Sequence, residues 1–311
     1  MRGKEMDQYF TGASAAELLV DVTTRFCTRS PPRLVCEPCA GDGALVKALL
    51  RQHPECEVLA YDLDETLATK HEWKCADFLS TNVEPISGCD FVLCNPPFKS
   101  GRAAKGNAKR GKDLTIPFIM KALKFAPLLG FILHQNKGAP QFASKIWKQC
   151  PNLRLVHHEL LRKTDSTFDT GDGPGNRRFV PCAIYVWQLQ DEAVPKPIEY
   201  KSTECPDFCM IPLNDDRCNL IVKTWGSKNR AGRVVATDAS DIAEEVARER
   251  KIYGAANGTN VHLFCTNVQK VVDTISRMEG DLNNFLSYAR DTPNVKITPA
   301  QFVWLYNKNR T

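Results

Sequence analysis

The sequence predicts an α/β protein with a doubly wound, mostly parallel sheet and a smaller C-terminal α+β lobe. Short apolar runs alternate with helical patterns over the first 190 residues, which is typical of βα units. The runs expected to form strands are Leu34–Cys36, Glu57–Tyr61, Phe91–Leu93, Leu129–Leu133, Leu153–His157 and Cys182–Trp187. The helices expected between them, with apolar residues at spacings of three and four, include Ala15–Arg25, Gly43–Gln52 and Ile116–Phe125.

Length and composition predict two domains. A chain of 311 residues is long enough for a full α/β core and a second, smaller lobe. The composition changes to Pro, Glu and Lys around residues 191–201, so we expect one domain over residues 1–190 and a C-terminal lobe over residues 191–311. In this lobe we expect strands at Cys218–Thr224 and Val261–Thr266, and helices at Ala239–Lys251, Val268–Arg290 and from Pro299 after Thr298.

Charge and cysteine content narrow the class of protein. The net charge of +5 permits a polyanionic partner without requiring one. No apolar stretch of about 18 residues occurs and residues 1–7 are polar, so we expect a soluble intracellular protein, cytoplasmic or nuclear, without a membrane partner. The thirteen cysteines are scattered among apolar neighbours and predict reduced core thiols. Neither Cys36 with Cys39 nor Cys205 with Cys209 predicts a metal site, because a closed site needs four convergent ligands.

A glycine turn follows the first expected strand. The segment 34–43 (LVCEPCAGDG) leads from a strand through Gly41 and Gly43 into a helix, an arrangement in which backbone lies close to a ligand. A dinucleotide-binding turn would have a third glycine where this sequence has Val46, and Glu37 would repel a pyrophosphate. S-adenosylmethionine suits the turn better, because its amino acid half carries an ammonium and a sulfonium.

Acidic residues follow the next two expected strands. Asp62 lies 19 residues after Gly43, at the end of the second strand, where a carboxylate accepts hydrogen bonds from ribose hydroxyls; Asp64 is the alternative. Asp77 and Phe78 follow at the distance expected for the end of a third strand. We expect Asp77 to accept from the adenine amino group of the cofactor, and Phe78 to lie on the purine face.

The tetrad Asn95-Pro96-Pro97-Phe98 comes directly after a buried strand and predicts the reactive centre. An exocyclic amine is a poor nucleophile because its lone pair is delocalised into the ring. If the Asn95 carboxamide oxygen and the Pro96 carbonyl each accept one N–H, the nitrogen becomes more tetrahedral and its lone pair points at the methyl group. The prolines fix the direction of that carbonyl, and Phe98 offers a stacking face for a planar substrate.

With these motifs in order, the chain resembles class I amino-methyltransferases of the NPPF/NPPY type, and is similar to the gamma-arranged N6-adenine DNA methyltransferases. The resemblance covers residues 1 to about 190 and implies a seven-stranded Rossmann-like methyltransferase sheet. It implies methyl transfer from S-adenosylmethionine to N6 of adenine in nucleic acid, with DNA favoured over RNA. It places Thr11, Glu37, Ala40 and Gly41 at the methionine part, Asp62 at the ribose, Asp77 and Phe78 at the adenine, and Asn95, Pro96, Pro97 and Phe98 at the target amine. The motif begins Glu-Pro here, where the family usually has Asp-Pro.

Further residues are candidates for substrate contacts. A target adenine must be flipped out of a duplex or lie in a single strand. The segment 99–113 has six cations and almost no apolar residues, and we expect Lys105, Lys109 and Arg110 to contact phosphates from a mobile loop. Phe168, in a second stretch expected to be flexible (167–178), is either a second stacking face or a hydrophobic anchor. The basic and aromatic segment 223–233 (KTWGSKNRAGR) also suits nucleic acid, although a packing lobe fits it nearly as well.

Three alternatives remain at the level of sequence. The same tetrad serves methylation of a protein glutamine side chain at N5, and the same adenine chemistry serves an RNA methyltransferase. A catalytically silent binding subunit is the non-enzymatic reading, and it would predict degenerate cofactor motifs, whereas Glu37, Gly41, Gly43, Asp62 and Asp77 are all present. The oligomeric state is left open.

Overall fold

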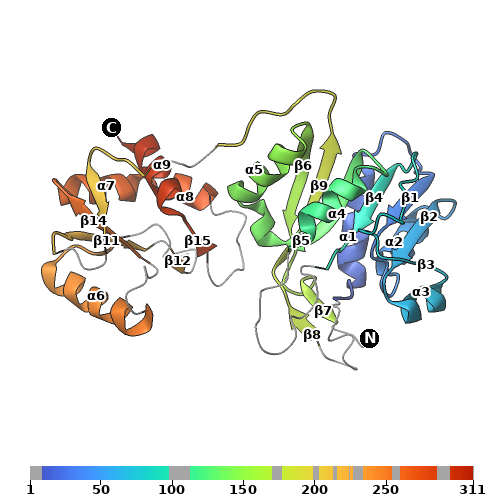
Figure 1. Cartoon of the computed structure of the whole chain (residues 1–311), viewed down its shortest axis with the longest axis horizontal. Helices are drawn as coiled ribbons and strands as arrows, with labels where there is room; N and C mark the ends of the chain where they lie inside the picture. The colour runs from blue at the N-terminus through green and yellow to red at the C-terminus, as the bar shows by residue number, and fades with distance from the viewer. Residues whose placement is uncertain are drawn as a thin grey trace. The chain divides into compact units, whose positions relative to one another are not determined.

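The computed structural model describes residues 9–97, 113–169, 177–198, 203–212, 216–223, 225–226, 234–253, 260–285 and 295–310. The chain divides into two compact units, Met1–Pro197 and Ile198–Thr311 (Figure 1). Each unit has its own sheet and its own apolar core. The two units are described separately below.

The N-terminal unit contains a mixed seven-stranded sheet in the order β3-β2-β1-β4-β5-β9-β6. All neighbouring pairs from β3 to β5 are parallel, whereas β9 is antiparallel to both β5 and β6. The strands are β1 (Leu34–Glu37), β2 (Glu57–Asp62), β3 (Lys74–Cys75), β4 (Phe91–Cys94), β5 (Leu128–His134), β6 (Leu153–Leu160) and β9 (Cys182–Leu189). The predicted seven-stranded, mostly parallel Rossmann-like sheet is confirmed.

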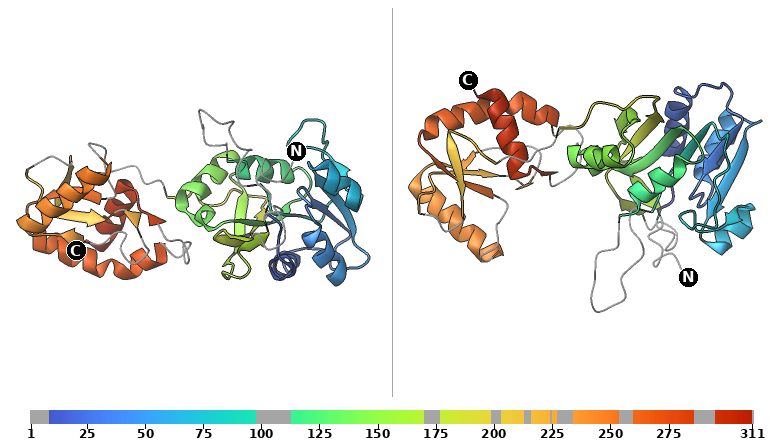
Figure 2. Two further views of the ribbon diagram at one scale, coloured as in Figure 1. Left: turned by 90° about the horizontal axis from the view of Figure 1, so that it is seen from below. Right: turned by 45° about the horizontal axis from the view of Figure 1, so that its top comes forward.

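Helices cover both faces of this sheet, because its central strands alternate apolar side chains between the two faces (Figure 2). Val35, Phe91 and Leu93 pack on one face with α1 and α2, whereas Cys36 and Val92 pack on the other with α4 and α5. The helices are α1 (Ala13–Thr24), α2 (Ala44–Gln52), α3 (Glu65–His71), α4 (Thr115–Ala122) and α5 (Pro140–Gln149), with a 3₁₀ turn, η2, at Gln135–Gly138.

The order of the sheet reverses between β1 and β4, which are hydrogen-bonded neighbours. In an open α/β sheet, ligands bind at the carboxyl ends of the strands next to such a reversal. The glycine turn follows β1 and Asn95 follows β4, so the topology brings the two predicted motifs to the same edge of the sheet.

A short hairpin lies within the stretch 167–178, which the sequence predicted to be flexible. Its strands β7 (Thr167–Asp169) and β8 (Arg177–Phe179) are antiparallel, with Phe168 opposite Arg178. The Gly- and Asp-rich composition of this stretch concealed the pairing, because the strands are short and their partner is each other. The structure does not describe residues 170–176 between them.

The C-terminal unit contains an antiparallel four-stranded sheet in the order β10-β14-β11-β13, with helices on both faces. Ile221 and Ala236 pack with Ile242 of α6, whereas Val222 and Leu263 belong to the cluster formed with α7, α8 and α9. The elements are β10 (Phe208–Ile211), β11 (Leu220–Lys223), β12 (Trp225–Gly226), β13 (Val234–Ala236), β14 (Asn260–Cys265), β15 (Val295–Lys296), α6 (Ala239–Tyr253), α7 (Val268–Arg277), α8 (Glu279–Phe285) and α9 (Pro299–Asn309).

The last helix begins as its sequence predicts. Thr298 Oγ1 accepts a hydrogen bond from Gln301 N, while the Gln301 side chain accepts one from Thr298 N at 2.8 Å, which completes a capping box before Pro299. The helix expected over 268–290 is instead divided at Met278 into α7 and α8, and residues 286–294 lie outside the described part of the chain. Among the described helices, none is both long and apolar enough to cross a membrane.

Candidate cofactor and amine-binding site

A small cavity of about 20 Å³ lies where β1 and β4 end. This volume is about that of one water molecule, so the cavity marks the place where these segments meet and does not enclose a ligand as the structure stands. It is lined by the segment 9–11, the turn after β1 and Asn95; the full set is Tyr9, Phe10, Thr11, Cys39, Ala40, Gly41, Asp42, Ala44, Leu45 and Asn95. The structure thus brings together Thr11, Ala40, Gly41 and Asn95, which the sequence predicted as site residues.

The turn after β1 needs glycine at two positions. Gly41 has a φ of 54° and Gly43 a φ of 82°, which place both in the left-handed region. A Cβ at Gly41 would lie 3.4 Å from Cδ1 of Phe10, and a Cβ at Gly43 would lie 3.1 Å from Cζ2 of Trp73. Trp73 also donates from Nε1 to the Gly41 carbonyl at 3.4 Å. No motif in the sequence marks Trp73, because it lies 32 positions after Gly41, which it contacts.

Glu37 is buried at 1 % exposure and is not one of the residues that line the cavity. Its Oε1 accepts a hydrogen bond from Cys39 N at 3.1 Å, whereas its Oε2 is buried with no hydrogen-bond partner among the described residues. Burial raises the pKa of Glu37 well above its ordinary value. An unsatisfied buried carboxyl oxygen behind the turn is an acceptor for a proton or for a cationic group, such as the ammonium of a methionine moiety.

Asp62 holds the glycine turn from the end of β2. Its Oδ2 accepts from Gly41 N at 2.7 Å and its Oδ1 accepts from Asp64 N at 2.8 Å. Burial raises the pKa of Asp62 above its ordinary value. Backbone N–H groups occupy only part of the roughly four lone-pair sites of a carboxylate, so an acceptor remains for a donor such as a ribose hydroxyl. Asp64 instead caps α3, accepting from Thr66 N at 2.9 Å, and the intervening Leu63 is 61 % exposed.

The expectation for Phe78 needs correction, whereas the role expected of Asp77 stays a prediction. Asp77 is exposed after β3 and accepts from Leu79 N at 2.9 Å. Phe78 is only 2 % exposed, and its ring stacks on Phe118 with a centroid distance of 5.8 Å and contacts Phe125 at 5.2 Å. Because other aromatic rings occupy its surroundings, we assign Phe78 to the core rather than to the purine face of the cofactor.

Asn95 lies at the edge of the cavity with a defined orientation. Its Nδ2 donates to the Tyr9 carbonyl at 3.2 Å and to Thr11 Oγ1 at 3.0 Å. A main-chain carbonyl only accepts hydrogen bonds, so the amide nitrogen must face Tyr9 and the amide oxygen must point elsewhere. That oxygen, Oδ1, is buried and has no hydrogen-bond partner among the residues that the structure describes. The site therefore offers an unfilled acceptor beside the cavity.

The other predicted substrate residues are placed in part. Pro96 is buried and Pro97 half-buried after Asn95, while Phe98, Lys105, Lys109 and Arg110 lie outside the described residues. Phe168 is fully buried and packs edge-on against Tyr9 with a centroid distance of 6.1 Å. A ring without exposed surface offers no face to a base, so of the two readings of Phe168 the structure supports the hydrophobic anchor.

The thirteen cysteines are all free thiols. Cys94 and Cys39 are hydrogen-bonded to each other beside Asn95, and burial raises the pKa of the Cys94 thiol well above its ordinary value. Among the described residues, no group of three or more His, Cys, Asp or Glu side chains is arranged to hold a metal ion.

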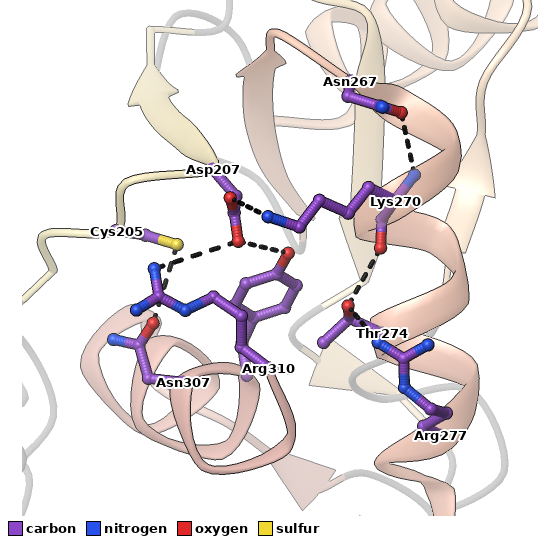
Figure 3. Close-up of polar contacts among 9 residues, drawn as sticks. Cys205, Asp207, Asn267, Lys270, Thr274, Arg277, Asn307 and Arg310 are labelled. Atoms are coloured by element: carbon purple, nitrogen blue, oxygen red, sulfur yellow. Dashed lines mark hydrogen bonds and ion pairs between the residues drawn. The ribbon is translucent and has the colours of Figure 1, made fainter.

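A second polar cluster, in the C-terminal unit, joins three elements of that unit (Figure 3). Asp207 accepts from Lys270 Nζ of α7 at 2.7 Å and from the Tyr306 hydroxyl of α9 at 3.1 Å, and Arg310 Nη1 lies 3.9 Å from it. The hydrogen bond from Lys270 lowers the pKa of Asp207, whereas burial raises the pKa of Tyr306 to about 12. The Asp207 carboxylate is paired with the cations of Lys270 and Arg310. The cluster therefore links the start of β10 to α7 and to the end of α9.

Comparisons with known proteins concern the fold. No family model matches the chain, and no curated protein matches its sequence. A candidate class I S-adenosylmethionine-dependent methyltransferase from Listeria monocytogenes is 16 % identical, with 61 % of this chain and 64 % of that chain covered and a TM-score of 0.42. The methyltransferase subunit of a type I restriction-modification system from Streptococcus thermophilus is 12 % identical, with 90 % and 59 % covered and a TM-score of 0.45.

A third similar structure is TrmN from Thermus thermophilus, at 17 % identity, 57 % and 52 % coverage and a TM-score of 0.35. The chain therefore spans between 52 % and 64 % of the length of these three proteins. At such low identities and TM-scores the similarity assigns no role to this chain or to its individual residues.

Proposed function

We propose that the chain transfers a methyl group from S-adenosylmethionine to the exocyclic N6 amine of adenine in nucleic acid, with DNA the favoured substrate. The observation that carries this proposal is the Asn95 carboxamide. Its oxygen is buried without a partner among the described residues, at the edge of a cavity that the glycine turn also lines. A buried unsatisfied acceptor costs about 1–3 kcal/mol, and a substrate amine would satisfy it.

Asn95 and Pro96 would activate the amine by accepting its two N–H groups. Two acceptors on one nitrogen favour tetrahedral geometry and reduce delocalisation of its lone pair into the purine ring. The Asn95 amide cannot turn away easily, because two hydrogen bonds from Nδ2 to Tyr9 and Thr11 hold it. The amine becomes acidic as it gains positive charge, so its proton leaves without a strong base at the site.

The residues around the cavity fit the cofactor that this reaction requires. S-adenosylmethionine, when bound, supplies a methyl group made electrophilic by its sulfonium. We propose that Thr11, Ala40 and Gly41 contact the methionine part, with the buried Glu37 carboxyl behind the turn as an acceptor for its ammonium. We further propose that Asp62 accepts from the ribose hydroxyls and that Asp77, exposed after β3, accepts from the adenine amino group. The unfilled Oε2 of Glu37 supports this assignment.

The choice of a nucleic-acid substrate is supported by the tetrad 95–98 and by the positive charge of the segment that follows it. An amine-bearing planar base fits a site with two fixed acceptors and a following aromatic residue, Phe98, and the segment 99–113 would contact phosphates. The target base must be extruded from a duplex or be presented in a single strand before it reaches Asn95.

Mass spectrometry of the methylated product tests this proposal. The chain is incubated with S-adenosylmethionine and separately with DNA, RNA and a protein extract, and the digested products are examined for N6-methyladenine and N5-methylglutamine. We expect N6-methyladenine in the DNA sample. N5-methylglutamine alone would overturn the nucleic-acid assignment, and methylation of RNA alone would replace DNA as the substrate.

The Asn95→Ala variant tests the mechanism. We expect methyl transfer to fall by about 100-fold or more, as for loss of one preorganised group at a reacting centre, while cofactor affinity changes little. The matched control is Asn152→Ala, which also removes an amide that donates to a main-chain carbonyl, that of Gln190 at 2.8 Å, but away from the cavity. Equal activity of the two variants would contradict the role of Asn95.

A further inference from the structure

The β7–β8 hairpin holds the segment 9–11 that lines the cavity. Phe10 N donates to the Asp169 carbonyl at 2.9 Å, and the two residues form an antiparallel bridge. The Tyr9 ring packs edge-on against Phe168, which is fully buried. The segment is therefore attached to the hairpin by main-chain and side-chain contacts.

The same segment contacts both predicted halves of the site. The Tyr9 carbonyl and the Thr11 hydroxyl accept the two hydrogen bonds from Asn95, and the Phe10 ring lies closest to the position of a Cβ on Gly41. A displacement of the segment would release the Asn95 amide and open the approach to the glycine turn at the same time. The position of the segment thus sets the geometry of the cavity.

Arg178 of β8 connects the segment to the surface. Its Nη1 donates to the Tyr9 hydroxyl at 3.1 Å, and its side chain is exposed. A guanidinium has five N–H donors in a planar fork, so one hydrogen bond to Tyr9 leaves donors that fit a phosphate in bidentate geometry.

We propose that Arg178 bridges a backbone phosphate of the nucleic acid and the Tyr9 hydroxyl, so that substrate binding on the hairpin tightens the cofactor cavity. This inference rests on the proposed function and adds a coupling between its two ligands. A phosphate that fixes the Arg178 side chain also fixes the Tyr9 hydroxyl to which Arg178 donates. Tyr9 belongs to the segment 9–11, which accepts the hydrogen bonds of Asn95 and lies against Gly41. Since coupling between two binding sites is reciprocal, the cofactor must strengthen nucleic-acid binding by the same factor.

The dissociation constant of S-adenosylhomocysteine, measured by calorimetry with and without a single-stranded oligonucleotide of about 12 nucleotides, tests the coupling. For the unmodified chain we expect the oligonucleotide to lower this constant by about 5-fold or more, the lower end of typical coupling. Arg178→Gln and Tyr9→Phe should each reduce the factor to about 1, and the double variant should show no further loss. Tyr9→Phe keeps the ring on Phe168 and removes only the hydroxyl.

Arg177→Gln is the matched control. Arg177 is the neighbouring exposed arginine of β8, and because side chains alternate along a strand, it faces away from the side on which Arg178 meets Tyr9. The Arg177→Gln variant removes the same charge as Arg178→Gln and should keep the coupling between the oligonucleotide and S-adenosylhomocysteine. Equal loss in Arg177→Gln and Arg178→Gln would overturn the proposal, because charge alone would then explain the effect.

The remaining outcomes separate this inference from the proposed function. If the unmodified chain binds S-adenosylhomocysteine but the oligonucleotide changes its affinity by a factor of 1, the coupling is wrong and the proposed function stands. If the coupling factor is observed and lost in Arg178→Gln while no N6-methyladenine forms, the coupling stands and the proposed reaction is wrong. A chain that does not bind S-adenosylhomocysteine refutes both.

Discussion

Gly43→Ala should destabilise the N-terminal unit because two independent effects meet at this residue. Gly43 precedes α2 with a φ of 82°, a conformation that L-residues rarely adopt. An added Cβ would also lie 3.1 Å from Cζ2 of Trp73, which is tighter than an ordinary carbon–carbon contact. Trp73 has little freedom to retreat, since its Nε1 donates to the Gly41 carbonyl and its ring stacks on His71 at a centroid distance of 5.4 Å.

The expected magnitude follows from these two contributions. The left-handed conformation costs an L-residue about 1–2 kcal/mol. Inserting a methyl group into a packed contact adds about 1–3 kcal/mol, and the lower half of this range applies because Trp73 is only half-buried. We therefore expect a loss of about 2–4 kcal/mol in the free energy of unfolding, a large part of the 5–15 kcal/mol that is typical of a domain.

Urea denaturation followed by circular dichroism measures this loss. Gly12→Ala is the matched control, because Gly12 also precedes a helix but has a φ of −69° and no atom within 4 Å of an added Cβ. We expect it to change stability by no more than about 1 kcal/mol. When Trp73 is also replaced by Ala, the Gly43→Ala substitution should lower the free energy of unfolding by less than it does when Trp73 is present. Equal stabilities of Gly43→Ala and Gly12→Ala would refute the reasoning.

Two further predictions concern Glu37 and Gly130. Burial raises the pKa of Glu37 above its ordinary value of 4.5. Below pH 4.5 the Glu37 carboxyl is protonated in both the folded and the unfolded chain, whereas at higher pH only the folded chain keeps the proton. The stability that this group contributes is therefore lost as the pH rises towards the folded-state pKa. Relative to Glu37→Gln, the unmodified chain should lose stability in urea denaturation as the pH rises above 4.5, and parallel curves would contradict the shift. Gly130→Ala should lower the free energy of unfolding by about 1–3 kcal/mol, because the added Cβ would meet the Thr23 side chain on α1. In thermal melting, the double variant Thr23→Ala/Gly130→Ala should recover part of this loss, and no recovery would place the strain elsewhere.

The sequence determined the elements of the sheet and the order of its motifs. Strands β1, β4, β5 and β9 are apolar runs of ordinary strand length. Because they are buried on both faces, they can be predicted as strands from their own residues, without knowledge of the strands they pair with. The glycines of the turn and the capping box at Thr298 were equally predictable, because each depends on residues within three or four positions. Local backbone conformation and hydrophobic burial suffice to specify these features.

The tertiary structure alone decided which side chains meet at the site. Asn95 contacts Thr11 across 84 positions and Tyr9 contacts Arg178 across 169, so no local pattern reveals either pair. Phe78 and Phe168 carry the residue type expected of a stacking face, yet packing buried both of them. Whether an aromatic ring faces a ligand or the core depends on which elements cover it, and that is a property of the packed sheet and its helices rather than of the residues adjacent in sequence.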